Sequence, residues 1–282
     1  MSHTETFRVR WNEVDAQGIV FNGHYLSYLD LAGTGYWRAM ALPYPMAFER
    51  LGVDWVLRGC QLEFLQPARF DELLSCEVRL GELGRSSLRF AATLRRGAQV
   101  LLEAELRYVM VSRESLQPQP VPEAMRAALA AFEAGESMVQ LRSGRWDELG
   151  LDAQPIRAAV FVKEQGIAAD LEWDGADPAE DCVHAVAYNR LGQALGTGRL
   201  LEHVPGVAKI GRMAVLPAVR SSGVGAQVLE TLMQAARRRG YRQVLLHAQA
   251  AAIGFYKRAG FAERGEPFEE AGIVHQEMTR TL

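Results

Sequence analysis

The chain has 282 residues, of which 49% are hydrophobic and 23% charged, and its formal net charge is −3. This length exceeds what one hydrophobic core ordinarily covers, so we expect two domains. The weak negative charge argues against a nucleic-acid-binding protein, and no apolar run approaches the ~20 residues of a membrane span. Three widely spaced cysteines and a polar amino-terminus predict a cytoplasmic protein without a metal site.

The first half of the chain predicts one strand, one long helix and then four consecutive strands. Apolar residues alternate with polar ones at 7–11, and apolar residues three and four apart over 25–40 are typical of a helix packed on a broad surface. An antiparallel sheet in this order can wrap around the helix, which is the hotdog fold. The later strands are predicted at 60–64, 73–80, 87–94 and 100–111.

The start of the predicted helix carries a motif. Residues 15–20 read Asp-Ala-Gln-Gly-Ile-Val and residues 22–26 read Asn-Gly-His-Tyr-Leu. Together with 64–71 and 84–87, this pattern resembles the 4-hydroxybenzoyl-CoA and YbgC-type acyl-CoA thioesterases. The resemblance covers residues 1 to about 135. It implies a hotdog domain that hydrolyses an acyl-CoA thioester and assembles as a homodimer or homotetramer.

Asp15 has two interpretations. An acid in a turn ahead of a helix is an ordinary turn or capping residue. The resemblance instead implies that Asp15 is the nucleophile or general base, with backbone N–H groups at the helix start stabilising an oxyanion. His24 could bind substrate or could be a packed, hydrogen-bonded residue. The substrate-binding residues that the resemblance implies are Asn22, Gly23, His24 and Tyr25.

A proline-rich segment at 117–122 ends the sheet, and residues 135–137 are typical of a linker after an alanine-rich helix. The predicted domains are therefore 1–135 and 136–282. The second is predicted to be a mixed α+β domain whose first clear helix begins at Pro155. Residues 170–181 are acidic and typical of a loop, and the acidic loop within them at 172–177 could attract a cationic amine or could be solvated surface. Its strands are predicted at 138–141, 183–188, 194–201, 210–215, 244–247 and 273–278, and a further helix at 250–259.

The stretch from Lys209 to Ala226 combines a short apolar strand, a loop with two glycines and the start of a helix. Pro217 ends the strand, and both Gly223 and Gly225 can adopt a positive φ. The N–H groups of such a loop can converge on an anion at the positive end of the helix. A lone Gly-x-Gly, however, is more often an ordinary tight turn.

The neighbouring motifs resemble the GNAT N-acyltransferases, most closely the ElaA-like branch. They are the Arg-x-x-Gly-x-Gly loop at 220–225, Phe-Tyr-Lys-Arg-Ala-Gly-Phe at 255–261, and blocks at 157–165 and 272–275. The resemblance implies a GNAT fold, acetyl-CoA or another acyl-CoA as substrate, and a small amine as acceptor. It places pantetheine on Met213, Ala214 and Val215, and pyrophosphate on Arg220, Ser221, Ser222, Gly223, Val224, Gly225 and Ala226.

Tyr256 matches the family's general acid for the departing thiolate, although it could be a core aromatic residue. Many family members carry a glutamate as base in the strand before the loop, whereas this chain has Gly211 beside Arg212. The candidates for the base are Glu202, His184, His247 or a water. We therefore expect an acyl-CoA hydrolase fused to an acyltransferase. The alternative is a working thioesterase whose second half is a non-catalytic acyl-CoA sensor or scaffold.

Overall fold

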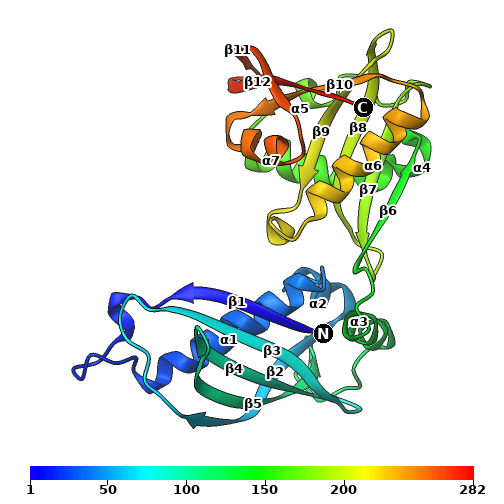
Figure 1. Ribbon diagram of the computed structural model, residues 1–282. Helices are drawn as coiled ribbons and strands as arrows, with labels where there is room; N and C mark the ends of the chain where they lie inside the picture. Colours follow the sequence, from blue (N-terminus) through cyan, green and yellow to red (C-terminus); the bar gives the residue numbers. More distant parts are fainter. The chain divides into compact units, whose positions relative to one another are not determined.

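The computed structural model describes residues 1–282 and divides them into two compact units, Met1–Met138 and Val139–Leu282. Each unit has its own sheet with helices packed against it, as Figure 1 shows. Helices and strands occur in both, and neighbouring strands are mostly antiparallel. The predicted α+β fold class is confirmed.

The first unit is one long helix on a five-stranded antiparallel sheet of order β1-β3-β4-β5-β2. The chain runs strand, helix and then four strands, as predicted, which is the hotdog arrangement (Figure 1). Its strands are β1 (Ser2–Arg8), β2 (Val53–Phe64), β3 (Leu73–Leu83), β4 (Ser87–Arg96) and β5 (Gln99–Ser112). Its helices are α1 (Asn22–Ala39), α2 (Met46–Leu51) and α3 (Glu123–Glu133).

Aromatic side chains hold α1 to the sheet. Tyr36 and Trp37 are fully buried, and the ring of Tyr36 meets that of Phe90 on β4 edge to face at 5.2 Å. The Tyr36 hydroxyl donates a hydrogen bond to Glu133 of α3 at 2.8 Å. Such aromatic pairs bury large areas in a fixed geometry. The buried face of α1 therefore fixes where its amino-terminal end lies.

Two predicted boundaries in this unit are wrong. The first strand ends at Arg8, and Trp11 lies in a 3₁₀ turn, Trp11–Glu13, with 77% of its surface exposed. The strand predicted from residue 60 begins at Val53. Val53, Trp55 and Val56 are residue types that favour strands, and they continue the pairing with β5 past a register shift.

The second unit has a seven-stranded sheet of order β11-β12-β10-β9-β8-β7-β6, in which only β9 and β10 are parallel neighbours. Its strands are β6 (Val139–Gly144), β7 (Val183–Asn189), β8 (Ala194–Val204), β9 (Val207–Val215), β10 (Gln243–Gln249), β11 (Ala262–Glu270) and β12 (Ile273–Thr281). Its helices are α4 (Trp146–Arg157), α5 (Ala169–Glu172), α6 (Val224–Arg238) and α7 (Ile253–Arg258), and a π-helix spans Ala158–Glu164.

Helices α4 and α6 cover opposite faces of this sheet. Val186 of β7 packs with Leu149 of α4 in one core cluster. Gly198 of β8, which pairs with Ala185 and not with Val186, faces Leu232 of α6. Successive residues of a strand point to opposite faces, so the two helices enclose the sheet between them.

The first helix of this unit starts earlier than predicted. It begins at Trp146, and Pro155 lies inside it and not at its start. Proline removes one N–H from the helical ladder and leaves the carbonyl four residues earlier without a partner. That carbonyl belongs to Leu151, whose surface is 87% exposed, so water can bond it. The helix then widens into the π-helix at Ala158.

Strand β11 was not predicted at all. Its sequence, Ala262–Glu270, contains no apolar alternation, and most of its side chains are exposed. It is an edge strand that pairs only with β12. Charged side chains are usual on such edges because they discourage pairing with other chains. Hydrophobic periodicity therefore carries no signal for this strand.

Gly198 allows close packing of α6 on the sheet. A Cβ at this position would lie 2.5 Å from Met213 Sδ and 2.8 Å from Leu232 Cδ1, whereas a Cβ at Gly211 would meet nothing within 4 Å. We expect Gly198→Ala to lower the free energy of unfolding of the second unit by about 1–3 kcal/mol through overpacking. Urea denaturation of the full chain measures this, with Gly211→Ala as the control that changes little. Equal effects of the two substitutions would contradict the packing described.

Candidate active sites

The strands β9 and β10 separate halfway along their length. Their parallel pairing covers Val207–Ile210 and ends there. Arg212 adopts a positive φ of 52°, and two residues of β9, Arg212 and Met213, lie opposite the single residue Gly198 of β8. This β-bulge turns β9 away from β10. The edge of β9 from Gly211 onward is therefore open to an extended polar ligand.

The loop after β9 presents backbone donors. Ser221 and Gly223 have φ values of 65° and 87°, and the Ser222 hydroxyl donates to the carbonyl of Val219 at 2.6 Å. None of the N–H groups from Ser221 to Ala226 donates to an acceptor in the chain. Of the two glycines that can adopt a positive φ, only Gly223 does so, because Gly225 lies inside α6. Six free donors at a helix start form a site for an anion.

Arg220 is held by other groups of the protein. Its guanidinium donates to both carboxylate oxygens of Glu164 at 2.6 Å, and its Nε donates to the carbonyl of Val215 at 3.1 Å. The hydrogen bonds with Arg220 lower the pKa of Glu164, and those with Glu164 raise the pKa of Arg220. The arginine therefore ties the loop to the π-helix, and the backbone supplies six free donors beside it.

A cleft of about 300 Å³ opens where β9 and β10 separate. Its wall comes from the π-helix, α5 and the segment before it, the two strands, α7 and the β11–β12 hairpin. Tyr256 lines it, and the side chain is buried with 7% of its surface exposed. Burial raises the pKa of Tyr256, and its hydroxyl has no hydrogen-bond partner in the chain. Tyr256 also packs against Phe261, so it is a core aromatic residue that lines the cleft.

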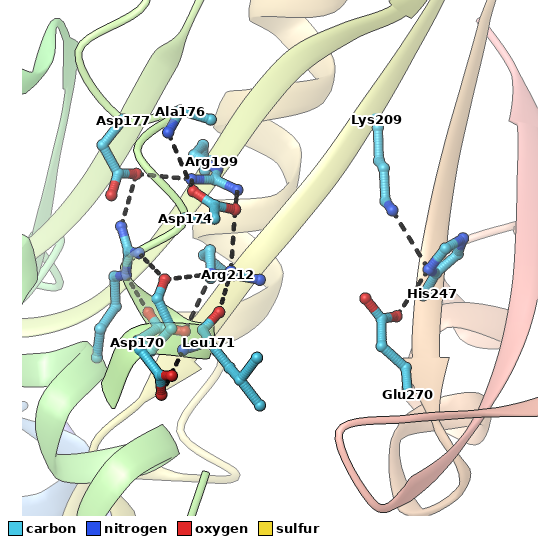
Figure 2. A network of polar contacts seen from close by, with 12 residues as sticks. Asp170, Leu171, Asp174, Ala176, Asp177, Arg199, Lys209, Arg212, His247 and Glu270 are labelled. Atoms are coloured by element: carbon cyan, nitrogen blue, oxygen red, sulfur yellow. Dashed lines mark hydrogen bonds and ion pairs between the residues drawn. The ribbon is translucent and has the colours of Figure 1, made fainter. Parts of the chain in front are cut away.

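His247 lies in this cleft beside a carboxylate. Its Nδ1 is 3.0 Å from Glu270 Oε2 and 3.3 Å from Lys209 Nζ, as Figure 2 shows. Burial alone would raise the pKa of Glu270, but the hydrogen bond with His247 and the charge of Lys209 hold it below its usual value. The ring of Phe268 meets the imidazole edge to face at 4.8 Å. The arrangement orients the imidazole.

Glu270 reaches His247 from a hairpin with an irregular strand. The β11–β12 pairing shifts register between Arg264 and Phe268. The amide of Gln276, which is 5% exposed, donates to the carbonyls of Arg264 and Gly265 at 2.8 and 3.0 Å. These bonds satisfy backbone groups that the bulge leaves without strand partners. Gln276 therefore fixes the shape of the hairpin that carries Glu270.

The other two side chains proposed as base lie elsewhere. His184 is 1% exposed, with Nε2 3.0 Å from the carbonyl of Asp177 and 3.1 Å from Cys182 Sγ. Burial lowers the pKa of His184, so it remains neutral inside the fold. Glu202 accepts a hydrogen bond from the Tyr241 hydroxyl at 3.1 Å and does not line the cleft. Of the three, only His247 faces the cleft.

The acidic residues of the loop at 172–177 are not free to attract an amine, which corrects one of the two interpretations offered above. Asp174 lies 2.6 Å from Arg199, and Asp177 lies 2.9 Å from Arg199 and 2.8 Å from Arg157. Glu172, 2% exposed, pairs with both Arg157 and Arg212. The hydrogen bond from Arg199 holds the pKa of Asp174 well below its usual range. The carboxylates are neutralised by arginines and fix one wall of the cleft.

In the first unit, Asp15 organises the turn ahead of α1. Its Oδ1 accepts from the N–H of Gln17 at 2.8 Å, and its backbone bonds Gly18 and Ile19. The side chain is half-buried. Asp15 is therefore a turn residue, which is the first of the two interpretations given above. Its second carboxylate oxygen has no hydrogen-bond partner in the chain.

The residues that follow Asp15 separate into an exposed and a buried group. Asn22 and Gly23 are exposed at the first turn of α1, where helical N–H groups have no partner within the helix. His24 is half-buried, with its ring 6.3 Å from that of Phe21. Tyr25, in contrast, is 2% exposed, and its hydroxyl accepts from the N–H of Ala68 at 3.1 Å. The structure thus brings the first three to the helix start and places Tyr25 in the core.

Sequence reasoning missed a buried carboxylate beside this turn. Glu13 is 8% exposed and accepts from the Tyr28 hydroxyl at 2.8 Å and from the N–H of Arg10 at 2.7 Å. Its carbonyl accepts from the N–H of Phe21 at 2.9 Å. Glu13 therefore fastens the turn to α1. The motif runs from Asp15 onward, so it gave no signal for this residue.

The hotdog unit and the split sheet with its anion-binding loop define a thioesterase-type unit joined to an acyltransferase-type unit. The Acetyltransferase (GNAT) domain family matches residues 159–282, and the Thioesterase superfamily matches residues 17–103. The chain therefore belongs to the GNAT acetyltransferase family through its second half and carries a thioesterase-superfamily domain in its first. No helix combines the length and apolar character needed to cross a membrane.

Proteins similar to each half are known. YyaT of Bacillus subtilis is 33% identical over 132 residues, which are 46% of this chain and 88% of YyaT. YjcF of the same organism, described as an uncharacterized N-acetyltransferase, is 36% identical over 130 residues, 46% of this chain and 90% of YjcF. The acyl-CoA thioesterase YbgC of Haemophilus influenzae is 25% identical over 121 residues, 43% of this chain and 89% of YbgC.

Removing Arg199 tests the ion network. Asp174 and Asp177 have lowered pKa values when folded, so the stability they contribute is present above the unfolded value near pH ~4 and is lost as the pH falls below it. We expect Arg199→Met to lower the free energy of unfolding by about 3–5 kcal/mol at neutral pH, since it breaks two ion pairs of a largely buried network and leaves three carboxylates with only two arginines. The decline below pH ~4 should also become shallower.

Urea denaturation of the full chain at several pH values measures both effects. The control is Arg237→Met, because Arg237 and its partner Glu230 form a half-exposed pair on α6 at 3.1 Å. That substitution should cost less than about 1 kcal/mol. If Arg199→Met were as mild as Arg237→Met, the network would not support the cleft wall.

Proposed function

We propose that the protein is a two-activity acyl-CoA enzyme. The first unit hydrolyses acyl-CoA thioesters, and the second transfers an acetyl or other acyl group from CoA to a small amine. The observation that carries the transfer reaction is the His247–Glu270 pair, which lies in a cleft directly beside the open edge of β9. No metal is required by either reaction.

The open edge of β9 and the following loop are proposed to hold CoA. Pantetheine, which contains two amide groups, would bond the backbone of Met213, Ala214 and Val215, where β10 no longer pairs with β9. The pyrophosphate would accept from the free N–H groups of residues 221–226 at the start of α6. Arg220 would act by holding this loop through Glu164. The thioester then lies at the point where the strands separate.

His247 is proposed as the base for transfer. With Nδ1–H donating to Glu270, the lone pair of Nε2 can take a proton from the acceptor amine as its nitrogen attacks the thioester carbonyl. The C–N bond forms, the tetrahedral oxyanion collapses and the C–S bond breaks. Tyr256 then gives its proton to the departing thiolate. This base replaces the glutamate that many family members carry in the preceding strand.

For hydrolysis we propose Asp15 as nucleophile or general base, with backbone N–H groups of Asn22 and Gly23 receiving the oxyanion and His24 binding substrate. Water supplies the oxygen of the released acid, and CoA leaves as the thiol. The name of the relative YbgC, an acyl-CoA thioesterase, supports this reaction. For Tyr25 we propose a structural role, because its hydroxyl bonds Ala68.

A second copy of the chain is proposed to complete the hydrolase site as a homodimer or homotetramer. Trp11, Phe21 and Phe70 are 77%, 57% and 50% exposed, and the rings of Trp11 and Phe70 lie 5.7 Å apart. Large apolar side chains gathered on one surface favour burial against a partner. Trp11 and Phe21 lie on either side of the Asp15 turn in the sequence, so a partner would also enclose this turn.

Substitution of Asp15 tests hydrolysis. We expect Asp15→Asn to lower the release of free thiol from acyl-CoA in the absence of amine by about 10²–10⁴-fold, because the group that attacks or activates water is lost. Asp30→Asn, which removes an exposed carboxylate from α1, the helix after the Asp15 turn, is the matched control and should keep the activity. Hydrolysis that survives in Asp15→Asn would exclude Asp15 as the nucleophile or general base.

Substitution of His247 tests transfer. His247→Gln should reduce amine-dependent thiol release by about 10²–10⁴-fold and remove the acid limb of its pH profile, since that limb reports the base. Glu270→Gln should cause a smaller fall, because it only orients the imidazole. Glu263→Gln on the same strand, where Glu263 pairs with Lys257 at 3.0 Å, is the control. An unchanged rate and pH profile in His247→Gln would rule out His247 as the base.

A further inference from the structure

Two charged groups approach the same nitrogen of His247. Lys209 Nζ lies 3.3 Å from Nδ1, and Glu270 Oε2 lies 3.0 Å from it. A neutral imidazole nitrogen has a single position in the ring plane, which either donates a hydrogen or accepts one. Nδ1 can therefore bond the carboxylate as a donor or the ammonium as an acceptor, but not both. One of the two charges is left without a partner.

Nδ1 is better placed to donate to the Glu270 carboxylate than to accept from the Lys209 ammonium. It is the closer group, and its hydrogen bond with His247 helps to hold the pKa of Glu270 below its usual value against the effect of burial. Lys209 then has no hydrogen-bond partner and forms no ion pair within 4.0 Å, and the charge of Glu270 acts on it only from a greater distance. Arg212, the other cation at the cleft, differs because Glu172 and Asp174 neutralise it at 2.9 and 3.0 Å. Lys209 is thus an unpaired cation on the cleft wall.

We propose that Lys209 binds an anionic group on the acceptor, so that the substrates of the second unit are small amines that also carry a carboxylate or a phosphate. This inference rests on the proposed acyl transfer. Figure 2 shows Lys209 and Glu270 on the same side of the cleft as His247, opposite the arginine network. The acceptor amine would meet the imidazole, and its anionic group would meet the ammonium.

The geometry limits the distance between the two groups of the acceptor. Hydrogen bonds to the imidazole and to the ammonium each need ~2.7–3.0 Å. Lys209 Nζ itself lies 3.3 Å from Nδ1 of the imidazole. The amine and the anion must therefore be only a few bonds apart, as in an α- or β-amino acid or an aminoalkyl phosphate. An uncharged analogue would leave the ammonium unpaired, which is how a polar site rejects a ligand.

Matched acceptor pairs test the proposal with the full chain and acetyl-CoA. The pairs are glycine and glycinamide, β-alanine and β-alaninamide, and phosphoethanolamine and ethanolamine. We expect at least one acid to exceed its uncharged analogue by more than tenfold in kcat/KM, and the three pairs separate carboxylate from phosphate recognition. In Lys209→Gln this ratio should fall towards one. Arg237→Gln removes one positive charge from α6, outside the cleft, and should keep the ratio. Uncharged amines that match or exceed the acids would overturn the proposal.

A binding measurement separates this inference from the transfer reaction. The imidazole NMR signals of His247, assigned by comparison with His247→Gln, are followed in the CoA-saturated chain during titration with β-alanine, phosphoethanolamine and β-alaninamide. A shift with an acid that is absent in Lys209→Gln supports the anion site even if no amine is acylated, in which case only the transfer reaction fails. No shift with either acid overturns the inference even if amines are acylated.

Discussion

The second unit depends on the point at which two parallel strands stop bonding each other. The bulge at Arg212 turns β9 away from β10 beyond Ile210, and the backbone groups on that edge lose their strand partners. Unpaired backbone groups favour a ligand that can bond them. The same divergence opens the cleft and directs the chain into the glycine-bearing loop at the start of α6. One local irregularity, the bulge at Arg212, therefore creates both the open edge of β9 and the cleft beside it.

The charged groups on the two sides of that cleft differ in how completely they are paired. On one side, three arginines and three acidic residues neutralise each other and hold the segment around α5 against the sheet. A network of this kind shapes a wall but has little net charge to attract a ligand. On the other side, a single imidazole nitrogen of His247 lies within reach of both Lys209 and Glu270. It can form a hydrogen bond with only one of them. The first side supplies rigidity, and the second supplies groups that can react or bind.

Much of the architecture was predictable because it depends on local pattern. Apolar alternation, helical spacing and turn residues indicated the sheet wrapped on a helix, and four motif blocks indicated the GNAT unit. The start of α4 was wrong because Pro155 can lie inside a helix when the freed carbonyl belongs to exposed Leu151. Strand β11 was missed because its charged edge sequence has no apolar period. An edge strand made of charged residues generally lacks the hydrophobic periodicity by which strands are predicted from sequence.

The chemistry of the cleft was harder to predict than the fold. His247 could be named only as one of several bases, since its pairing with Glu270 depends on the hairpin register and a bulge that no sequence period reveals. Lys209 is the first residue of the strand–loop–helix stretch 209–226 that the sequence pointed out. Its position beside the His247 imidazole depends on the pairing of β9 with β10, which the sequence does not reveal. The partners of Arg220 and Arg199 lie far away in the sequence, so their ion pairs were likewise invisible.

The hairpin that carries Glu270 lies at the edge of the sheet, and Gln276 fixes its shape through backbone carbonyls rather than through core packing. Changes in its length or turn would therefore move the carboxylate without disturbing the proposed CoA site, which consists of the open edge of β9 and the start of α6. Donor binding and acceptor choice are thus mechanically separate. A chain of this design can exchange one acceptor for another during evolution by remodelling a peripheral loop, while its use of CoA stays constant.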